Sequence, residues 1–245
     1  MRFDIITIFP EFIDSIKSHS IIKRAIEKNI IEINSIDFRD YALDKHKHVD
    51  DYAYGGGAGM LISVQPVHQA MQQVPNLDSA YKLITSPSGT TFNQKVAERL
   101  SKLDHIVIVC GHYEGIDSRI NDYIDEEISL GDYILTGGEL AALTVIDSVS
   151  RLIPGVITED SIKDESFTTG LLEYPQYTRP YEYDGKKVPD VLVSGHHANI
   201  KKWQRFESLK KTYFNRPDLL ENIELSKEDL KYLEMIKNGE ELILK

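Results

Sequence analysis

Three short segments of the sequence combine glycine with small polar residues at the ends of apolar runs or just beyond them. They are TSPSG (85–89), CGHYEGID (110–117) and ISLGDYILTGGE (128–139). Glycine lets main-chain N–H and C=O groups approach a ligand closely, which suits recognition of an adenine edge and a ribose. Each segment alone is typical of a tight turn. Three of them at corresponding places favour a nucleoside site.

The glycine patterns that hold a pyrophosphate are missing from the sequence. It contains neither G-x-x-x-x-G-K-[ST] nor G-x-G-x-x-G after the first strand-like run. A ligand that carries a nucleoside without a pyrophosphate therefore fits better than ATP or NAD. A further glycine cluster, YGGGAGM (54–60), lies in a long irregular stretch after RDYALDKHKHVDD. The flanking Tyr54 and Met60 favour a functional loop there over a plain linker.

Three charged residues are candidates for catalytic roles. Arg151 follows a largely apolar helical run, where an exposed surface arginine is the ordinary interpretation. Asp164 and Glu165 lie in the polar segment 158–170, where solvated charge is the ordinary interpretation. If substrate binding orders this segment, one of the two carboxylates becomes a candidate general base.

Metal and thiol chemistry have little support in the sequence. His46 and His48, followed by two aspartates, form a weak pattern that is more typical of solvated surface. Cys110 is the single cysteine, so an internal disulfide and a cysteine zinc cluster are excluded. We expect Cys110 to be a packed small hydrophobe and expect no metal site.

The elements that position these residues follow from the apolar pattern. Residues 3–8, 30–36, 81–86 and 105–110 form short apolar runs, mostly continuous, as in parallel strands covered on both faces. Helical patterns occupy residues 11–28, 65–73, 93–101 and 139–150. Their alternation predicts an α/β fold with a parallel sheet. Ligands of such sheets bind at the carboxyl ends of the strands, where the glycine segments lie.

Composition and charge limit the class of protein. The chain has 245 residues, and we expect an α/β domain over 1–157, a flexible linker over 158–170 and a mainly helical domain over 171–245. The net charge of −11 argues against a protein that coats nucleic acid by charge alone. Segment 196–216, however, has six lysines and arginines against one glutamate, enough for a local RNA-binding surface. No signal peptide or membrane span is indicated, so we expect a cytoplasmic protein.

Taken in order along the chain, the motifs resemble the bacterial tRNA (guanine-N1)-methyltransferase family. Besides the three glycine segments they include IITIFPEF, VDDYAYGGGAGMLI, SFTTGLLEYPQYTRP and VPDVLVSGHHANIKKWQ. The resemblance implies a SPOUT-type fold with a deep trefoil knot, an exception to the usual rule of unthreaded chains. It also implies a homodimer with active sites between protomers. The implied reaction transfers methyl from S-adenosylmethionine to N1 of guanosine 37 in tRNA, whose anticodon stem-loop the C-terminal domain and the linker grip.

The resemblance also implies roles for individual residues. The methyl donor would be held by Thr85, Ser86, Pro87, Gly111, Tyr113, Glu114, Gly115, Leu130, Gly131, Asp132, Tyr133, Ile134, Leu135, Gly137 and Gly138. Arg151 would stabilise charge on the purine O6. The family's base is an aspartate directly before Ser-Phe, and here that position holds Glu165, with Asp164 one residue earlier. Glu165 is favoured by position, and Asp164 stays an alternative.

Two other interpretations remain open. Another knotted RNA methyltransferase would share the fold and the methyl donor but modify a different base. An RNA-binding protein without catalysis would use the basic segment and would show no affinity for S-adenosylmethionine. A nicotinamide-dependent enzyme is poorly supported because its glycine pattern is missing.

Overall fold

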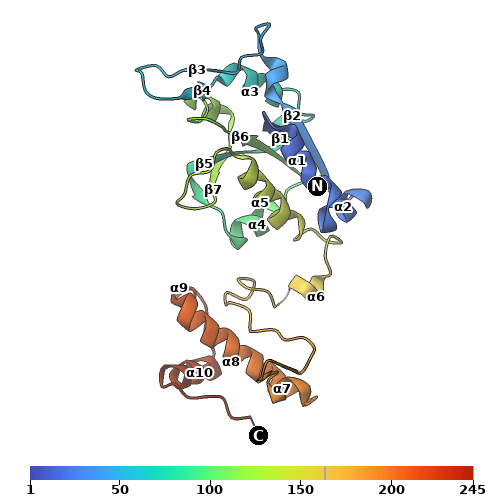
Figure 1. Ribbon diagram of the computed structural model, residues 1–245, viewed down its shortest axis with the longest axis vertical. Helices are drawn as coiled ribbons and strands as arrows, with labels where there is room; N and C mark the ends of the chain where they lie inside the picture. Colours follow the sequence, from blue (N-terminus) through green and yellow to red (C-terminus); the bar gives the residue numbers. More distant parts are fainter. Residues whose placement is uncertain (163, 245) are drawn as a thin grey trace. The chain divides into compact units, whose positions relative to one another are not determined.

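A computed structural model describes residues 1–162 and 164–244 of the chain. The described chain divides into two compact units, 1–158 and 159–245. Unit 1 contains a parallel sheet and its covering helices, and unit 2 contains short helices around a longer one (Figure 1). The assignment of 158–170 as a linker stays a prediction.

The central sheet of unit 1 has five parallel strands in the order β2-β1-β6-β5-β7. Their bounds are β1 Arg2–Thr7, β2 Glu32–Asp37, β5 Tyr81–Thr91, β6 His105–Cys110 and β7 Glu126–Ser129. The predicted parallel α/β sheet is confirmed. Strand β7 was not predicted, because its four residues, EEIS, begin with two glutamates and so form no apolar run. In the structure these two glutamates are half-buried.

Helices cover both faces of this sheet. The side chains of Ile106 and Ile108 on β6 pack into one core, and Val107 and Val109 pack into the other. The first core is closed by α1 (Pro10–Asp14), α2 (Ser20–Glu27), α4 (Gln94–Leu100) and α5 (Glu139–Ser150). The second is closed by α3 (Val64–Met71) and the 3-10 helix η2 (Phe38–Tyr41). Figure 1 shows α3 on one side of the sheet and α4 and α5 on the other.

The prediction of one continuous helix over residues 11–28 is wrong. The segment contains α1, a 3-10 turn over Ser15–Ser18, and α2. The break lies at His19, which is extended, and Ser20, which has a φ of 49°. Serine is a weak helix former, and the apolar residues on either side keep a spacing that hides the interruption. Helix α5, in contrast, has the bounds that its sequence pattern predicts.

The glycine cluster at 54–60 is the tip of a hairpin. Strands β3 (Asp50–Tyr52) and β4 (Met60–Ile62) pair antiparallel, although the sequence predicted an irregular stretch here. Strands of three residues are too short to show a period. The hairpin is anchored to the loop after β6, since the Ile62 N–H donates to the Gly115 carbonyl and the Asp117 N–H donates to the Ile62 carbonyl, each at 2.9 Å.

Unit 2 is built around one long helix. It contains α6 (Glu159–Ile162), the short strands β8 (Glu182–Tyr183) and β9 (Lys186–Lys187), α7 (Asp190–Val193), α8 (His197–Asn215), α9 (Pro217–Leu220) and α10 (Lys227–Lys237). Its core joins Phe206 and Leu209 of α8 to Leu233 and Ile236 of α10. Across residues 1–162 and 164–244, we find no helix with the length and apolarity to cross a bilayer.

Candidate functional site

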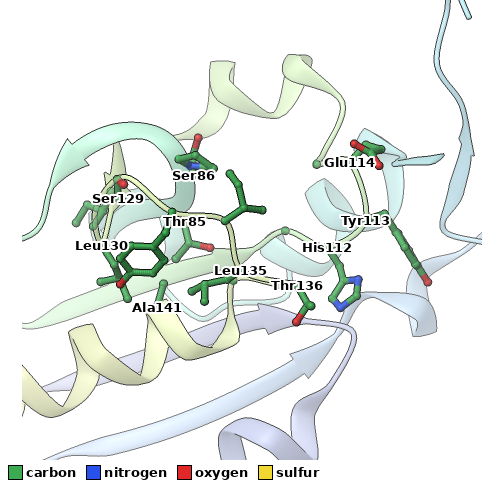
Figure 2. Close-up of a pocket in the computed structure, with 18 of the residues that line it drawn as sticks. Thr85, Ser86, His112, Tyr113, Glu114, Ser129, Leu130, Leu135, Thr136 and Ala141 are labelled. Carbon is green, nitrogen blue, oxygen red and sulfur yellow. The ribbon is translucent and has the colours of Figure 1, made fainter. Parts of the chain in front are cut away.

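A cavity of about 260 Å³ lies where the loops of β5, β6 and β7 meet at the carboxyl ends of the strands. The three glycine segments of the sequence form its walls, as a parallel sheet requires. Figure 2 shows Ser129 and Leu130 on one side of the cavity and His112 and Tyr113 on the other.

The lining of the cavity can be compared residue by residue with the set predicted to hold the methyl donor. Every member of that set lines the cavity except Asp132, which is exposed and lies outside the lining. Contact of these residues with a methyl donor stays a prediction. Five lining residues were not predicted: His112, Ile128, Ser129, Thr136 and Ala141. All but Ala141 lie inside the glycine segments, so the segments themselves were the available signal.

The first wall is a bulge in β5. Thr85 and Thr90 both align with Ile128 of β7, so residues 86–89 loop out of the ladder; we call them the 86–89 bulge. A Cβ on Gly89 would overlap the backbone of Glu127 and Ile128. Glycine is required there because the bulge crosses β7 at backbone contact distance.

The other two walls meet at Gly138. Its N–H donates to the Gly111 carbonyl at 2.8 Å, and His112 and Gly137 form a β-bridge beside it. Gly138 has an ordinary φ of −81°, so glycine is required here by the lack of space for a Cβ and not by the backbone conformation. A Cβ at Gly138 would overlap the Thr85 hydroxyl and would lie 2.9 Å from the Cα of Cys110. All three loops therefore converge on one backbone position.

The loop after β6 also supports the hairpin. Tyr113 has a φ of 57° and Gly115 a φ of 118°, so the chain turns sharply between them. The Glu114 N–H donates to the Met60 carbonyl at 3.2 Å. A Cβ at Gly59 would overlap the Glu114 side chain. The hairpin thus rests on a cavity wall, and its tip exposes the ring of Tyr54 completely.

A buried carboxylate lies directly behind the cavity. Glu139, in the first turn of α5, is 6% exposed and accepts a 2.7 Å hydrogen bond from the hydroxyl of the fully buried Thr7. The amino-terminal end of α5 favours this negative charge. Burial, with the nearby Glu139 charge, raises the pKa of the Cys110 thiol well above its ordinary value. Cys110 is fully buried in the first core, as expected of a packed small hydrophobe.

His112 is the cavity residue with unmet hydrogen-bonding capacity. Its Nδ1 is buried and has no hydrogen-bond partner in the described part of the chain. The ring lies edge-on to Phe9 at 5.2 Å and to Tyr113 at 5.0 Å between centroids. A buried polar atom without a partner is costly, and a ligand that supplies a partner would recover that cost.

The candidate catalytic residues lie in different units. Arg151 directly follows α5 in unit 1, is partly exposed and is not part of the cavity lining. Asp164 and Glu165 lie in unit 2, where Asp164 is exposed and Glu165 is half-buried. The next residues turn sharply, because Phe167 has a φ of 76° and its N–H donates to the Leu171 carbonyl at 2.8 Å. The catalytic roles of all three stay predictions.

The basic segment 196–216 has less unpaired positive charge in the structure than its sequence suggests. It folds as α8 with its flanking residues, and three of its cations are paired: Arg205 with Asp229, Lys210 with Glu241 and Arg216 with Asp218. Arg205 holds the pKa of the Asp229 carboxyl at about 2. Among the described residues, the exposed cations of this segment without an ion pair are Lys201, Lys202 and Lys211.

The described residues offer no cluster of metal ligands. In 1–162 and 164–244 no group of three or more His, Cys, Asp or Glu side chains is arranged to hold a metal ion. The His46 and His48 rings lie near each other, but His48 Nδ1 bonds to the Asp44 carboxylate at 2.7 Å.

Comparison with known proteins identifies the family. Residues 1–222 match the family described as tRNA (guanine-1)-methyltransferase TrmD. A tRNA (guanine-N(1)-)-methyltransferase of Clostridium perfringens strain SM101 is 56% identical over 234 residues, 95% of this chain and 99% of its own length. One from Sulfurihydrogenibium sp. strain YO3AOP1 is 51% identical over 243 residues, 98% of this chain and 96% of its own. The chain therefore belongs to the tRNA (guanine-1)-methyltransferase TrmD family.

Proposed function

We propose that this protein transfers a methyl group from S-adenosylmethionine to N1 of guanosine 37, next to the anticodon of tRNA. The observation that carries the proposal is the cavity at the carboxyl ends of β5, β6 and β7, built from the segments that the family resemblance assigns to the methyl donor. Membership of the TrmD family supports the reaction. Because its proposed substrate is tRNA, we also propose that the protein acts in the cytoplasm.

The cavity suits S-adenosylmethionine by its chemistry. Close backbone approach at Gly137 and Gly138 leaves main-chain groups, rather than side chains, to recognise a nucleoside. When bound, the donor supplies an electrophilic methyl group on a positively charged sulfur. The convergence of three loops on Gly138 supports the proposal that this region is the trefoil knot of the family.

Residues of the chain then accept the proton of guanine N1 and stabilise the resulting negative charge. Guanine N1 carries a proton at neutral pH, so a base must accept it as the N1–methyl bond forms and the sulfur–methyl bond breaks. We assign this role to Glu165, with Asp164 as the alternative, for a contribution of roughly 10²- to 10⁴-fold. Loss of the proton moves negative charge to the purine O6. The guanidinium of Arg151 keeps its charge at all working pH values and is suited to stabilise that oxygen.

We propose that the protein acts as a homodimer with active sites between protomers. Phe12 on α1 and Leu140 on α5 are 43% and 49% exposed, so unit 1 presents apolar side chains to a partner. These features support a homodimer, with the anticodon stem-loop bound by unit 2 and the linker through Lys201, Lys202 and Lys211.

The decisive experiment uses two tRNA transcripts that differ only in guanosine or adenosine at position 37. Each is incubated with the full-length protein and S-adenosylmethionine, and primer extension reports a methyl group on the Watson–Crick edge as a block. We expect a block with guanosine only, and only when the donor is present. A protein that binds the donor but blocks neither transcript would retain the methyltransferase assignment and refute the target. Failure to bind the donor would refute the proposed reaction.

A further inference from the structure

Glu127 lies on β7 beneath the 86–89 bulge, outside the lining of the cavity. Its Oε2 accepts a 2.9 Å hydrogen bond from the Ser88 hydroxyl. Ser88 in turn lies 2.7 Å from the hydroxyl of Ser86, which lines the cavity. Because Gly89 also rests on the Glu127 backbone, this residue holds the bulge through both its main chain and its carboxylate.

The second oxygen of the same carboxylate reaches another part of the site. Asn121 donates its side-chain N–H to Glu127 Oε1 at 3.0 Å. Asn121 belongs to the 3-10 helix η4 (Ser118–Tyr123), which follows the loop after β6. Asp117, the last residue of that loop, caps η4 by accepting the Arg119 N–H at 3.0 Å. Glu127 is thereby connected to the second cavity wall.

The third wall continues from Glu127 along the chain. Two residues later β7 ends at Ser129, whose hydroxyl accepts the Gly131 N–H at 3.2 Å at the start of the segment 130–138. The Glu127 carboxylate therefore links the bulge to η4, while its main chain continues through β7 into the loop after that strand. Hydrogen bonds to a charged acceptor are stronger than neutral ones, so this carboxylate is suited to hold the bulge and η4 in one arrangement.

We infer that Glu127 is a positioning residue that keeps the cavity in the shape that binds the methyl donor. The inference rests on the proposed function, because it takes S-adenosylmethionine as the ligand. If the bulge is freed, only a fraction of molecules has the binding-competent shape. The apparent Kd then rises in inverse proportion to that fraction, while turnover at saturating donor is retained. Loss of Glu127 should therefore weaken donor affinity without lowering turnover at saturating donor.

Glu126 provides a matched control on the same strand. It accepts hydrogen bonds from Arg99 at 2.6 Å and from the Tyr81 hydroxyl at 3.0 Å. Neither partner lines the cavity. Glu126→Ala removes the same number of atoms and a comparable set of charged contacts, so it reports the cost of losing a glutamate from β7 without loosening the loops.

The test measures the affinity of the full-length protein for S-adenosylmethionine by titration calorimetry and kcat at saturating donor and tRNA. We expect Glu127→Ala and Ser88→Ala each to raise the Kd about tenfold, with kcat within about twofold of the unchanged protein. The double variant should show little more than the effect of Glu127→Ala, because both changes break the contact between Ser88 and Glu127. Glu127→Gln, which keeps an acceptor for Asn121, should rescue part of the loss, and Glu126→Ala should leave Kd within about twofold.

Three outcomes would overturn the inference while leaving the proposed function intact. They are an equal Kd for Glu127→Ala and Glu126→Ala, multiplicative effects in the double variant, and a fall in kcat without a change in Kd. If Glu127→Ala does not fold, Ser88→Ala and Glu127→Gln carry the same comparison. If the unchanged protein does not bind S-adenosylmethionine, the proposed function fails, and this inference fails with it.

Discussion

Gly138→Ala is the sharpest test of how the three cavity loops are joined. The new methyl group would overlap the Thr85 hydroxyl and would lie 2.9 Å from the Cys110 Cα and 3.1 Å from the Gly111 nitrogen. Two of these three neighbours are backbone atoms, which cannot rotate away. The Thr85 hydroxyl can move only by giving up its 3.3 Å hydrogen bond to the Val109 carbonyl.

The magnitude of the effect follows from this crowding. Overpacking a closed site costs about 1–3 kcal/mol, and backbone neighbours place Gly138→Ala at about 2–3 kcal/mol. The entropy that alanine removes from the unfolded chain, about 0.4–1 kcal/mol, is offset by the poorer helix cap that alanine forms. For a unit of this size we therefore expect the melting temperature to fall by about 4–12 °C.

Gly111→Ala is the matched control, since Gly111 is the hydrogen-bond partner of Gly138. The nearest atom to a Cβ at Gly111 would be Ile116 Cγ1 at 3.6 Å, an ordinary contact. Thermal and urea unfolding of both variants, followed by far-UV circular dichroism, gives the comparison. If Gly138→Ala unfolds within about 2 °C of Gly111→Ala, the loops are not packed at backbone distance and the reasoning is refuted.

Four further results are expected. Arg151→Ala should abolish methylation and leave donor affinity unchanged by calorimetry; a folded variant that loses donor binding would contradict its role. Of Glu165→Gln and Asp164→Asn, the change at the true base should lower kcat by about 10²-fold or more, and full activity in both would exclude a linker base. The lowered pKa of Asp229 stabilises unit 2 above pH 3.8, by at most about 2 kcal/mol because its arginine partner is partly exposed. This stability should disappear as the pH falls to about 2, and in Asp229→Asn, as urea unfolding followed by the fluorescence of the single tryptophan would show. Lys202→Ala should reduce the slope of the logarithm of the tRNA association constant against the logarithm of salt concentration by about 0.8. Lys210→Ala should change this slope little, because Lys210 is already paired with Glu241.

Much of unit 1 could be predicted from the sequence because its signals are local. Continuous apolar runs such as HIVIVC (105–110) mark strands covered on both faces, and the structure buries both alternating sets. Glycine with small polar residues marks close backbone approach, and all three such segments line one cavity. Helix α5 was predicted with correct bounds because its apolar pattern is long and uninterrupted.

The rest depends on contacts between residues far apart in the chain. Segment 196–216 looks strongly basic in the sequence, but Asp229 and Glu241, which neutralise two of its cations, come from 24 and 31 residues further along. The hydrogen bonds of Glu127 join Ser88 to Asn121, and no spacing in the sequence indicates such a link. Local patterns predict elements and loops, whereas these pairings arise only when the elements pack.

The bond between Gly138 and Gly111 also has a consequence for the order in which the protein folds. A chain emerging from the ribosome presents β5 and β6 before residues 130–138 exist, and domains begin to fold from the amino-terminal side. The segment that ends at Gly138 is therefore the last of the three to be synthesised, and its hydrogen bond to Gly111 can form only afterwards. A nascent chain that stops short of α5 has the strands but no finished cavity. The proposed methyl donor would stabilise only the completed unit, by an amount that grows with donor concentration.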